Sequence, residues 1–380
     1  MHICYLLLSP TFGMHQYTAD YANRMVQAGH KVTLVTTEYY PGHRYLPSVS
    51  VSKPVALKDT GFSPNGLRVW IARRAINAVL EQKPDVVHVT GPHLWNILVM
   101  RALRKASIPT IHTLHDLDPH PGSAYGPLLY LWNRAVLRNA THILVHGQCY
   151  RQRLLEHGMA SDNVTYTPLL HLFLSGTWME QPDRLVDGMA YDPYVLFFGR
   201  IESYKGVADL IAAWVRLPEV LRTQARLVLA GLGQLEMVWK EPLPAGIEVR
   251  NHLIRDEEAL TLFQRCALLV LPYIGATQSA LIPAAYFFRK AVLITSSGAL
   301  PEYVEPGVTG WIVEPKHPAS LARALTEALS DFDALERMGC AGRRWYDEHR
   351  KSESATVQQM YARLVGREVQ AQPDSQSRHI

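Results

Sequence analysis

Two cations and two glycines follow one short apolar run in the second half of the chain. The run Tyr194–Phe198 leads into Gly199 and Arg200, and Lys205 and Gly206 come soon after. A glycine at a strand end, followed by cations and the start of a helix, gathers positive charge and backbone amides at one edge of a sheet. This arrangement suits a diphosphate, although two solvated surface charges would give the same pattern.

Histidine and aspartate gather after another apolar run, in the first half. Behind Pro109–Ile111 come His112, His115, Asp116, Asp118 and His120. Ligands of open parallel sheets bind beyond the carboxyl ends of the strands, so these side chains could ligate a metal, titrate or hydrogen-bond a sugar. No partner elsewhere completes a recognised metal-ligand spacing, and we expect no metal. A substrate-binding histidine and a structural one both stay open.

Glycines mark two further turns. Gly13 lies between the first apolar run and the first helical pattern, and a single glycine is not the three-glycine dinucleotide fingerprint, which disfavours a dehydrogenase. Gly13 either lets a phosphate approach the backbone or is a plain loop glycine. Gly231 and Gly233 follow the run Arg226–Ala230 and form a turn suited to a base or a ribose.

Strand-like runs alternate with helical patterns along the chain, which predicts parallel, doubly wound sheets. The expected strands are Ile3–Leu8, Val32–Thr36, Val86–Val89, Pro109–Ile111 and Ile143–Val145, then Tyr194–Phe198, Arg226–Ala230, Ile247–Asn251, Leu268–Leu271, Ala291–Thr295 and Trp311–Val313. The expected helices are Tyr17–Ala28, Leu67–Gln82, Leu94–Lys105 and Leu128–Asn139, then Gly206–Val215, Glu257–Arg265, Ala280–Phe288 and Pro318–Ser330. The fold class is therefore α/β, with two Rossmann-like domains in tandem.

The alternation of strand-like and helical patterns is interrupted by a polar stretch at residues 173–193, which predicts the domain boundary. We expect a first domain over 1–172 and a second over 173–345. A helical pattern then continues from Asp333 to about Val365, and its part over 346–365 is expected to pack back toward the first domain. Residues 366–380 are polar and form an expected disordered tail.

Charge is distributed unevenly along the 380 residues. Residues 1–172 hold 16 Lys and Arg against 9 Asp and Glu, a balance of +7, whereas 173–380 hold 22 against 25, a balance of −3. The histidines are skewed the same way, with 13 of 17 before Thr177. The basic residues are dispersed and accompany no nucleic-acid motif, so we expect no nucleic acid as partner.

The cysteines and the hydropathy pattern place the protein in the cytoplasm. Cys4, Cys149, Cys266 and Cys340 lie more than seventy residues apart and form no metal-ligand pair, which is typical of a reducing compartment. No apolar stretch approaches the roughly 20 residues that a spanning helix needs, so any membrane contact is expected to be peripheral.

Together these features resemble the retaining nucleotide-sugar glycosyltransferases of family four, which have the GT-B fold of two Rossmann-like domains with a cleft between them. The resemblance extends over nearly the whole chain. It is carried by the Gly13 turn, Ala28–Val32, Lys83–His88, Thr110–Asp116, Gly199–Arg200 with Lys205–Gly206, Gly231–Gly233, Gly298–Glu302 and Gly307–Gly310.

The resemblance implies roles for named residues. Arg200 and Lys205 are expected to hold the donor diphosphate, and His115 to contact the sugar from the first domain, making these three the catalytic set. The implied donor-binding residues are Gly13, Gly199, Gly231, Gly233, Ile254, Thr277, Gln278, Ser279, Ala280 and Glu302.

One departure from the family is plain. Members usually carry two glutamates eight residues apart, the first for donor sugar hydroxyls and the second for the ribose, and the matching positions here hold Ala276 and Ala284. Thr277, Gln278 and Ser279 stand beside the first of them. The run Ala-Thr-Gln-Ser followed by a small residue resembles a variant branch of the family, so the loss does not by itself predict inactivity.

The implied function is transfer of a sugar from a UDP- or GDP-sugar to a polysaccharide, glycolipid or lipid-linked acceptor with retention, a hexosyltransferase reaction that needs neither metal nor cofactor. Cell-envelope or exopolysaccharide synthesis is the expected setting. The alternatives are a catalytically silent homologue that binds a nucleotide-sugar or partners an active transferase and, less favoured, a nucleotide-sugar epimerase. The sequence indicates no oligomeric state.

Three basic segments of the first half bear on the acceptor. They are Arg68 with Arg73 and Arg74, Arg101 with Arg104 and Lys105, and the stretch Tyr125–Arg153, in which Tyr130, Trp132 and Tyr150 alternate with Arg134, Arg138, Arg151 and Arg153. Such segments are either ordinary helices with an arginine face or a surface for anionic lipid. Together they favour a phosphorylated or lipid-linked acceptor and peripheral contact with the inner face of the membrane.

Overall fold

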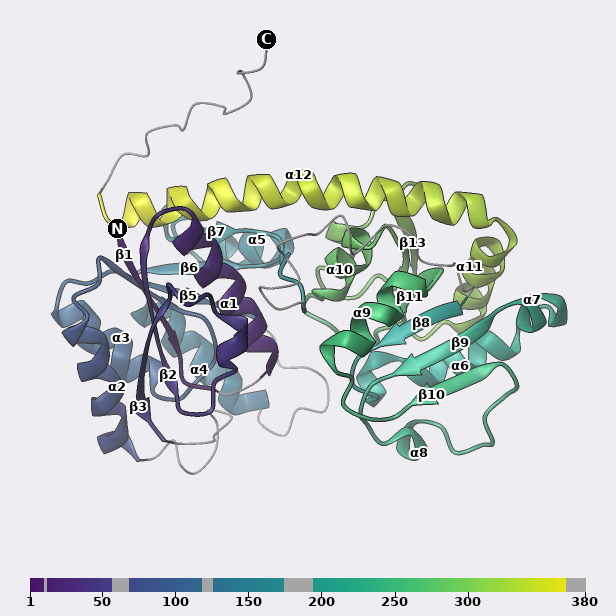
Figure 1. Cartoon of the computed structure of the whole chain (residues 1–380), viewed down its shortest axis with the longest axis horizontal. Coiled ribbons are helices and arrows are strands. Elements are labelled where there is room, and N and C mark those ends of the chain that lie inside the picture. Colours follow the sequence, from purple (N-terminus) through teal and green to yellow (C-terminus); the bar gives the residue numbers. More distant parts are fainter. Residues whose placement is uncertain (10–11, 57–67, 118–125, 174–193, 367–380) are drawn as a thin grey trace, which may run out of the picture.

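The computed structural model describes residues 1–9, 12–56, 68–117, 126–173 and 194–366. Two parallel sheets with helices on their faces lie side by side, and one long helix runs along both (Figure 1). The two expected Rossmann-like domains are thereby confirmed. The four cysteines are all free thiols.

The first sheet has seven parallel strands in the order β3-β2-β1-β4-β5-β6-β7. The strands are β1 (His2–Leu7), β2 (Lys31–Thr37), β3 (Ser50–Val55), β4 (Val86–Val89), β5 (Thr110–Thr113), β6 (His142–Val145) and β7 (Val164–Tyr166). The helices are α1 (Phe12–Gln27), α2 (Val69–Glu81), α3 (Asn96–Lys105), α4 (Gly126–Asn139) and α5 (Gln148–Glu156). Strand order reverses between β1 and β4, which is where a doubly wound sheet binds its ligand.

The second sheet has six parallel strands in the order β10-β9-β8-β11-β12-β13. The strands are β8 (Tyr194–Phe198), β9 (Arg226–Ala230), β10 (Ile247–Arg250), β11 (Leu268–Leu271), β12 (Ala291–Thr295) and β13 (Gly310–Val313). The helices are α6 (Val207–Val215), α7 (Glu219–Gln224), α8 (Leu235–Val238), α9 (Asp256–Arg265), α10 (Leu281–Phe287) and α11 (Pro318–Ser330). The strand order of this second sheet reverses between β8 and β11.

Three elements of the first domain are not predicted by the sequence patterns. Strand β3 lies at the sheet edge and contains a proline, β7 has three residues, and α5 is rich in polar residues. Edge strands tolerate proline and need no apolar run, because only one side is paired. The central strands β1 and β4 are buried on both faces and read clearly as apolar runs.

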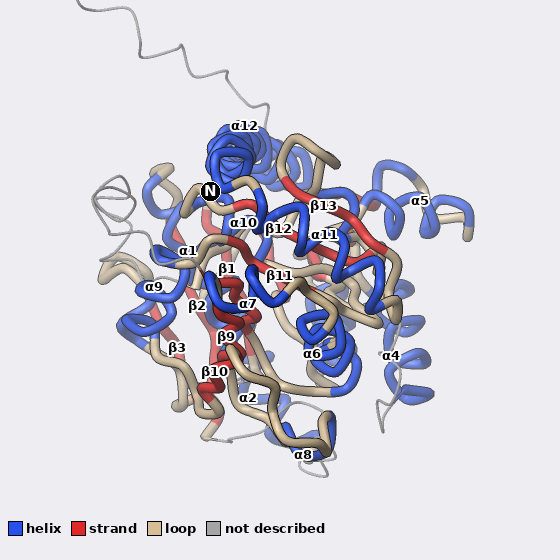
Figure 2. Tube along the Cα trace, turned by 90° about the vertical axis from the view of Figure 1, so that its right-hand side faces the viewer, coloured by secondary structure: helices blue, strands red, loops and turns tan. Residues whose placement is uncertain are grey.

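Helix α12 (Phe332–Leu364) is one continuous element that follows both domains, and Figure 2 shows it nearly end-on above the sheets. Its first half packs on α10, and its second half reaches the first sheet, where the Tyr361 hydroxyl lies 3.0 Å from that of Tyr5 and 2.6 Å from Nδ1 of His88. Helix α12 therefore contacts both domains and connects them.

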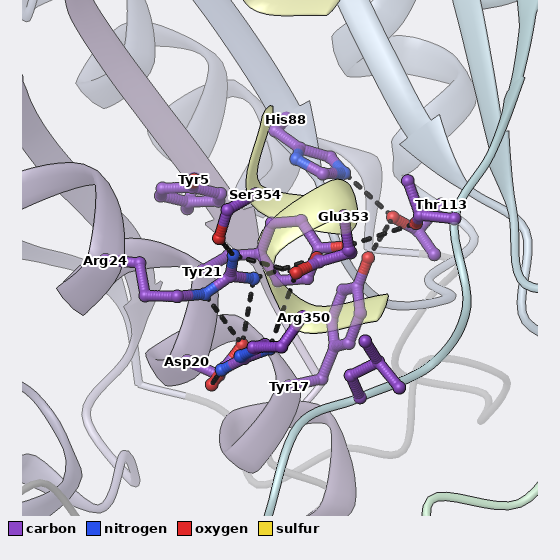
Figure 3. Close-up of polar contacts among 12 residues, drawn as sticks. Tyr5, Tyr17, Asp20, Tyr21, Arg24, His88, Thr113, Arg350, Glu353 and Ser354 are labelled. Atoms are coloured by element: carbon purple, nitrogen blue, oxygen red, sulfur yellow. Dashed lines mark hydrogen bonds and ion pairs between the residues drawn. The ribbon is translucent and has the colours of Figure 1, made fainter. Parts of the chain in front are cut away.

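A largely buried cluster of four charged residues, Asp20, Arg24, Arg350 and Glu353, joins α12 to α1 (Figure 3). Arg24 of α1 is paired with Asp20 at 3.0 Å and with Glu353 of α12 at 2.8 Å, and Arg350 of α12 is paired with both carboxylates. Burial alone would raise the pKa of Asp20, but the guanidiniums of Arg350 and Arg24 hold that pKa well below its usual range. The two charges of each sign thus compensate one another inside the protein.

Candidate active site

The loops after β8 and β11 meet at the strand reversal of the second sheet. The Cβ of an alanine at Gly206 would lie 1.8 Å from the carbonyl oxygen of Pro272, and Gly206 has φ +68°. The Ile274 amide also donates to the Tyr204 carbonyl at 2.8 Å. Glycine is required at 206 because the two loops touch there, and their contact fixes the place of Arg200 and Lys205.

Arg200 and Lys205 are held differently. The Arg200 guanidinium donates to Glu202 at 2.7 Å and to the Tyr204 hydroxyl at 3.2 Å, and its side chain is 68% exposed. The Lys205 ammonium lies 3.7 Å from the centre of the Tyr273 ring, a cation–π contact. In the part of the chain that the structure describes, no carboxylate is paired with Lys205, so its charge remains available to an anion at this edge.

The glycines after β8 and β9 allow close approach of the two loops. A Cβ at Gly231, which has φ +145°, would lie 2.0 Å from the Gly199 carbonyl oxygen, and a Cβ at Gly233 would lie 2.2 Å from that of Ile201. The Gly233 amide donates to Asn251 at 2.9 Å. These glycines therefore have a packing role within the protein whatever else they bind.

The segment that lacks the family's glutamates lies against the first domain. Ala276 is partly buried beside the main core, and Ala284 is buried within α10, which packs on α12. Thr277 is 5% exposed, and its hydroxyl donates to the Asp116 carboxylate at 2.8 Å. The Gln278 side-chain amide donates to the His115 carbonyl at 2.8 Å. Two consecutive residues of one domain thus hold two consecutive residues of the other.

His115 is a half-buried imidazole on the loop after β5. Its Nε2 lies 2.9 Å from the Thr90 carbonyl oxygen, which can only accept, so Nε2 carries the proton and Nδ1 is the acceptor. The ring meets Tyr17 edge-on with centroids 4.9 Å apart, and Tyr17 in turn bonds Thr113 at 3.0 Å (Figure 3). Burial lowers the pKa of His115.

Burial disfavours the charged form of other histidines at this end of the first domain. Burial lowers the pKa of His112 to about 3 and that of His171 to about 4, and burial together with neighbouring histidines holds the pKa of His88 and His146 well below 6.5. These buried histidines therefore add hydrogen-bonding groups rather than positive charge at neutral pH.

Glu302 binds the other domain in this structure. Its two carboxylate oxygens accept from the backbone amides of Gln148 at 2.6 Å and Cys149 at 2.8 Å, at the start of α5. A carboxylate at a helix N-terminus is favourable because the free amides there carry partial positive charge. The next residue, Tyr303, donates its hydroxyl to the His146 carbonyl at 2.8 Å, so this segment ties the domains together.

The remaining sequence-predicted residues lie at three separate places in the fold. Gly13 falls inside the first turn of α1, and a Cβ there would meet open space. Ser279 and Ala280 precede α10, and the Ser279 hydroxyl accepts from the Leu281 amide at 3.3 Å. Ile254 follows β10 and packs against the core, at the far side of the second sheet from β11.

Two side chains of the site escaped the sequence reasoning. Asp116 was considered only as part of a polar segment, and Tyr273, which carries Lys205 on its ring, was not singled out. Asp116 comes three residues after the end of β5 and Tyr273 two residues after the end of β11, and that position was the available signal. Among the described residues, no group of three His, Cys, Asp or Glu side chains could hold a metal ion, and no helix is long and apolar enough to cross a bilayer.

Comparisons with known proteins match both halves. The glycosyl transferase 4-like domain matches residues 12–169, and the glycosyl transferases of group 1 match residues 190–345. The glycogen synthase of Mycobacterium tuberculosis is 32% identical over 299 residues, covering 73% of this chain and 68% of that protein. D-inositol 3-phosphate glycosyltransferase 1 of Catenulispora acidiphila is 26% identical over 353 residues, covering 84% and 82%.

A solved structure gives the same architecture. The Anabaena protein HepE, in complex with UDP, superposes with a TM-score of 0.71 at 16% identity, covering 96% of this chain and all of that one. With both sheets, both domain matches and the glycogen synthase similarity in agreement, this chain belongs to the family-four glycosyltransferases with the GT-B fold.

Proposed function

We propose that the protein is a retaining hexosyltransferase that moves a sugar from a UDP- or GDP-sugar to a polysaccharide, glycolipid or other lipid-linked acceptor on the cytoplasmic side of a membrane. The carrying observation is the placement of Arg200 and Lys205 at the strand reversal of the second sheet, where Lys205 is paired with no carboxylate of the described residues. HepE, which shares the fold, was solved with UDP and with UDP-glucose, which supports a nucleotide-sugar as donor.

The positive charge of Arg200 and Lys205 can promote breakage of the bond between the sugar and the diphosphate. As the bond from the anomeric carbon to the diphosphate breaks, negative charge grows on the leaving phosphate, and Arg200 and Lys205 stabilise that charge more in the transition state than in the ground state. The acceptor hydroxyl forms the new bond on the same face and passes its proton to the departing phosphate. These cations supply what a metal supplies elsewhere, so we propose a metal-independent reaction.

The two domains are proposed to bind different substrates. We propose that residues 1–172 bind the acceptor and that 173–345 bind the donor, with 346–365 joining them; the expected boundary over 173–193 and the expected tail over 366–380 lie almost wholly outside the described residues. His115 contacts the sugar from the first domain, where Nδ1 of its neutral ring can accept from a hydroxyl. Gly13 leaves open space in which a phosphate can approach the start of α1.

A second candidate function is that of a silent homologue, which binds the donor without transferring its sugar. It is kept because positions 276 and 284 hold alanine instead of the family's glutamates. An epimerase is less favoured, since it would present more carboxylates in the cleft. Donor hydrolysis separates the candidates: the transferase releases sugar from UDP-glucose or GDP-mannose and transfers it when lipid extract is added. Binding without any release or transfer would favour the silent homologue.

A groove between α4 and α5 supports contact with lipid. Its volume is about 850 Å³, and none of the described residues that line it is acidic. The basic lining residues are Arg134, Arg138, Arg153 and His157, and the apolar ones include Leu117, Leu137 and Met159. Tyr130 at its rim is 59% exposed, and neighbouring Leu131 is 66% exposed. Cations beside exposed apolar side chains suit an anionic membrane surface.

The structure also limits which residues of the basic aromatic stretch Tyr125–Arg153 can contact lipid. Trp132 and Tyr150 are buried, with Trp132 donating to the His93 carbonyl at 3.2 Å, so they belong to the core. Arg104 donates to the carbonyls of Arg138 and Asn139 and thus joins α3 to α4. Contact with lipid is therefore assigned to the α4 side of the groove.

Vesicle sedimentation tests the membrane proposal. We expect binding to vesicles that contain phosphatidylglycerol, weak binding to pure phosphatidylcholine, and a loss of about tenfold for Arg134→Glu combined with Arg138→Glu. Arg216→Glu, an exposed change on the second domain, is the control. Equal binding of both variants would contradict the groove as the contact surface.

A further inference from the structure

We propose that Tyr17 is a positioning residue, which holds the imidazole of His115 in the orientation that sugar binding requires. The inference rests on the proposed function and deepens it, since His115 is the residue proposed to contact the sugar from the first domain. The hydrogen bond from Nε2 of His115 to the Thr90 carbonyl oxygen, at 2.9 Å, holds only one atom of the ring. The direction of Nδ1, which accepts from a hydroxyl, therefore depends on what packs against the ring.

The Tyr17 ring is the common contact of three histidines. Its centroid lies 4.9 Å from that of His115, 5.2 Å from that of His146 and 5.6 Å from that of His171, at interplanar angles of 85°, 75° and 84°. These histidines come after three neighbouring strands, β5, β6 and β7. Tyr17 is fully buried on α1, so a rotation of His115 would have to displace a ring that is packed on several sides.

The hydroxyl of Tyr17 is anchored to the strand that leads to His115. It lies 3.0 Å from Oγ1 of Thr113, the last residue of β5 (Figure 3). Both side chains are fully buried, and a buried hydroxyl without a partner is costly, so this bond fixes where the ring lies. A phenylalanine would fill the same space, but it would lack the fixed point beside His115.

The Thr113 hydroxyl is in turn held by His88 and by helix α12. Nε2 of His88 lies 2.8 Å from Oγ1 of Thr113, and Nδ1 of His88 lies 2.6 Å from the Tyr361 hydroxyl. These side chains are all fully buried, and hydrogen bonds in a buried chain strengthen one another. An unbroken hydrogen-bonded chain thus connects Tyr361 of α12, the helix that joins the domains, to the Tyr17 ring.

Calorimetric titration of the full chain with UDP, UDP-glucose, GDP and GDP-mannose tests the role of Tyr17. For the nucleotide pair that binds, we expect His115→Ala to raise the ratio of the nucleotide-sugar Kd to the nucleotide Kd by about fivefold or more, since a hydrogen bond to the sugar is lost. Tyr17→Phe keeps the ring and removes its anchor, so the ratio should rise by about threefold. In the His115→Ala background the same change should raise it by less than about 1.5-fold, because Tyr17 acts through His115.

Substitution of Thr113 tests the same anchor from its other side. Thr113→Val keeps a β-branched side chain on β5 and removes the hydroxyl, so it should raise the ratio by about threefold or more. Thr113→Ser keeps the hydroxyl and should leave the ratio within about twofold of that of the unaltered protein. In all these variants the Kd of the nucleotide alone should change by less than about twofold, since none of these residues is proposed to contact it.

Tyr286→Phe is the matched control. The buried Tyr286 hydroxyl lies 2.9 Å from the Tyr303 carbonyl oxygen and 2.8 Å from Oγ1 of Thr309, so its removal also costs a buried hydroxyl its hydrogen bonds, but in the second domain and away from His115. We expect this variant to leave the ratio unchanged.

Three outcomes would overturn the positioning role while nucleotide binding upholds the proposed function. They are an unchanged ratio in Tyr17→Phe, a rise by the same factor with and without His115→Ala, and an equal rise in Tyr286→Phe. An unchanged ratio in His115→Ala itself would overturn the sugar contact of His115 and the inference with it. Failure of the unaltered protein to bind either nucleotide would instead overturn the proposed function.

Discussion

Lys205→Ala is expected to lower sugar transfer, or hydrolysis of the nucleotide-sugar, by about 100-fold or more, the usual cost of removing one group that stabilises transition-state charge. Lys205 lies over the Tyr273 ring at 3.7 Å, and in the described part of the chain it has no carboxylate partner whose loss would destabilise the fold. The melting temperature should fall by only a few degrees, about what the loss of one cation–π contact costs.

Arg200→Ala should also lower activity strongly while preserving stability, because the Arg200 side chain is 68% exposed and its ion pair with Glu202 is worth little. The control is Arg216→Ala, which removes an exposed arginine of the same domain whose guanidinium donates to the Ala212 carbonyl at 2.7 Å and to no other group of the described residues. Initial rates and thermal melts of the three variants provide the readout. If Lys205→Ala and Arg200→Ala both stay as active as Arg216→Ala, the phosphate assignment is wrong.

Glu353→Gln is expected to cost about 3–5 kcal/mol of unfolding free energy, the usual effect of breaking a buried ion pair by removing one partner. Glu353 is 2% exposed and lies between Arg24 at 2.8 Å and Arg350 at 3.5 Å. Its neutralisation leaves two buried guanidiniums with Asp20 as the one remaining carboxylate of the cluster. Urea denaturation followed by circular dichroism measures the loss.

Asp347→Asn is the matched control on the same helix. Asp347 is paired with Arg343 one turn away at 2.9 Å, but its side chain is 48% exposed, so the pair should contribute about 1 kcal/mol or less. A Glu353→Gln protein as stable as Asp347→Asn would show that the cluster between α1 and α12 does not stabilise the protein.

The central strands could be predicted because both of their faces are buried. The patterns place β8, β9, β11 and β12 at the bounds that the structure gives, since continuous apolar runs between glycine and proline admit little else. The edge strand β3 and the polar helix α5 lack that signal, and their formation depends on neighbours far away in the sequence.

The site could be predicted in part for a similar reason. A residue just beyond a buried strand must lie at the carboxyl edge of its sheet, which is enough to single out Arg200, Lys205 and the segment around His115. The pairing of Thr277 with Asp116 and of Glu302 with the start of α5 depends on how two domains face each other. No local pattern within either domain carries that information.

Isothermal titration of the purified protein with UDP and GDP tests the central claim most directly, because the proposed reaction requires a nucleotide diphosphate at Lys205 and Arg200. The account predicts saturable binding of one of the two nucleotides with one site per chain, and loss of that binding by about tenfold or more in Lys205→Ala. Absence of heat with both nucleotides, in a protein shown to be folded by its thermal melt, would contradict it.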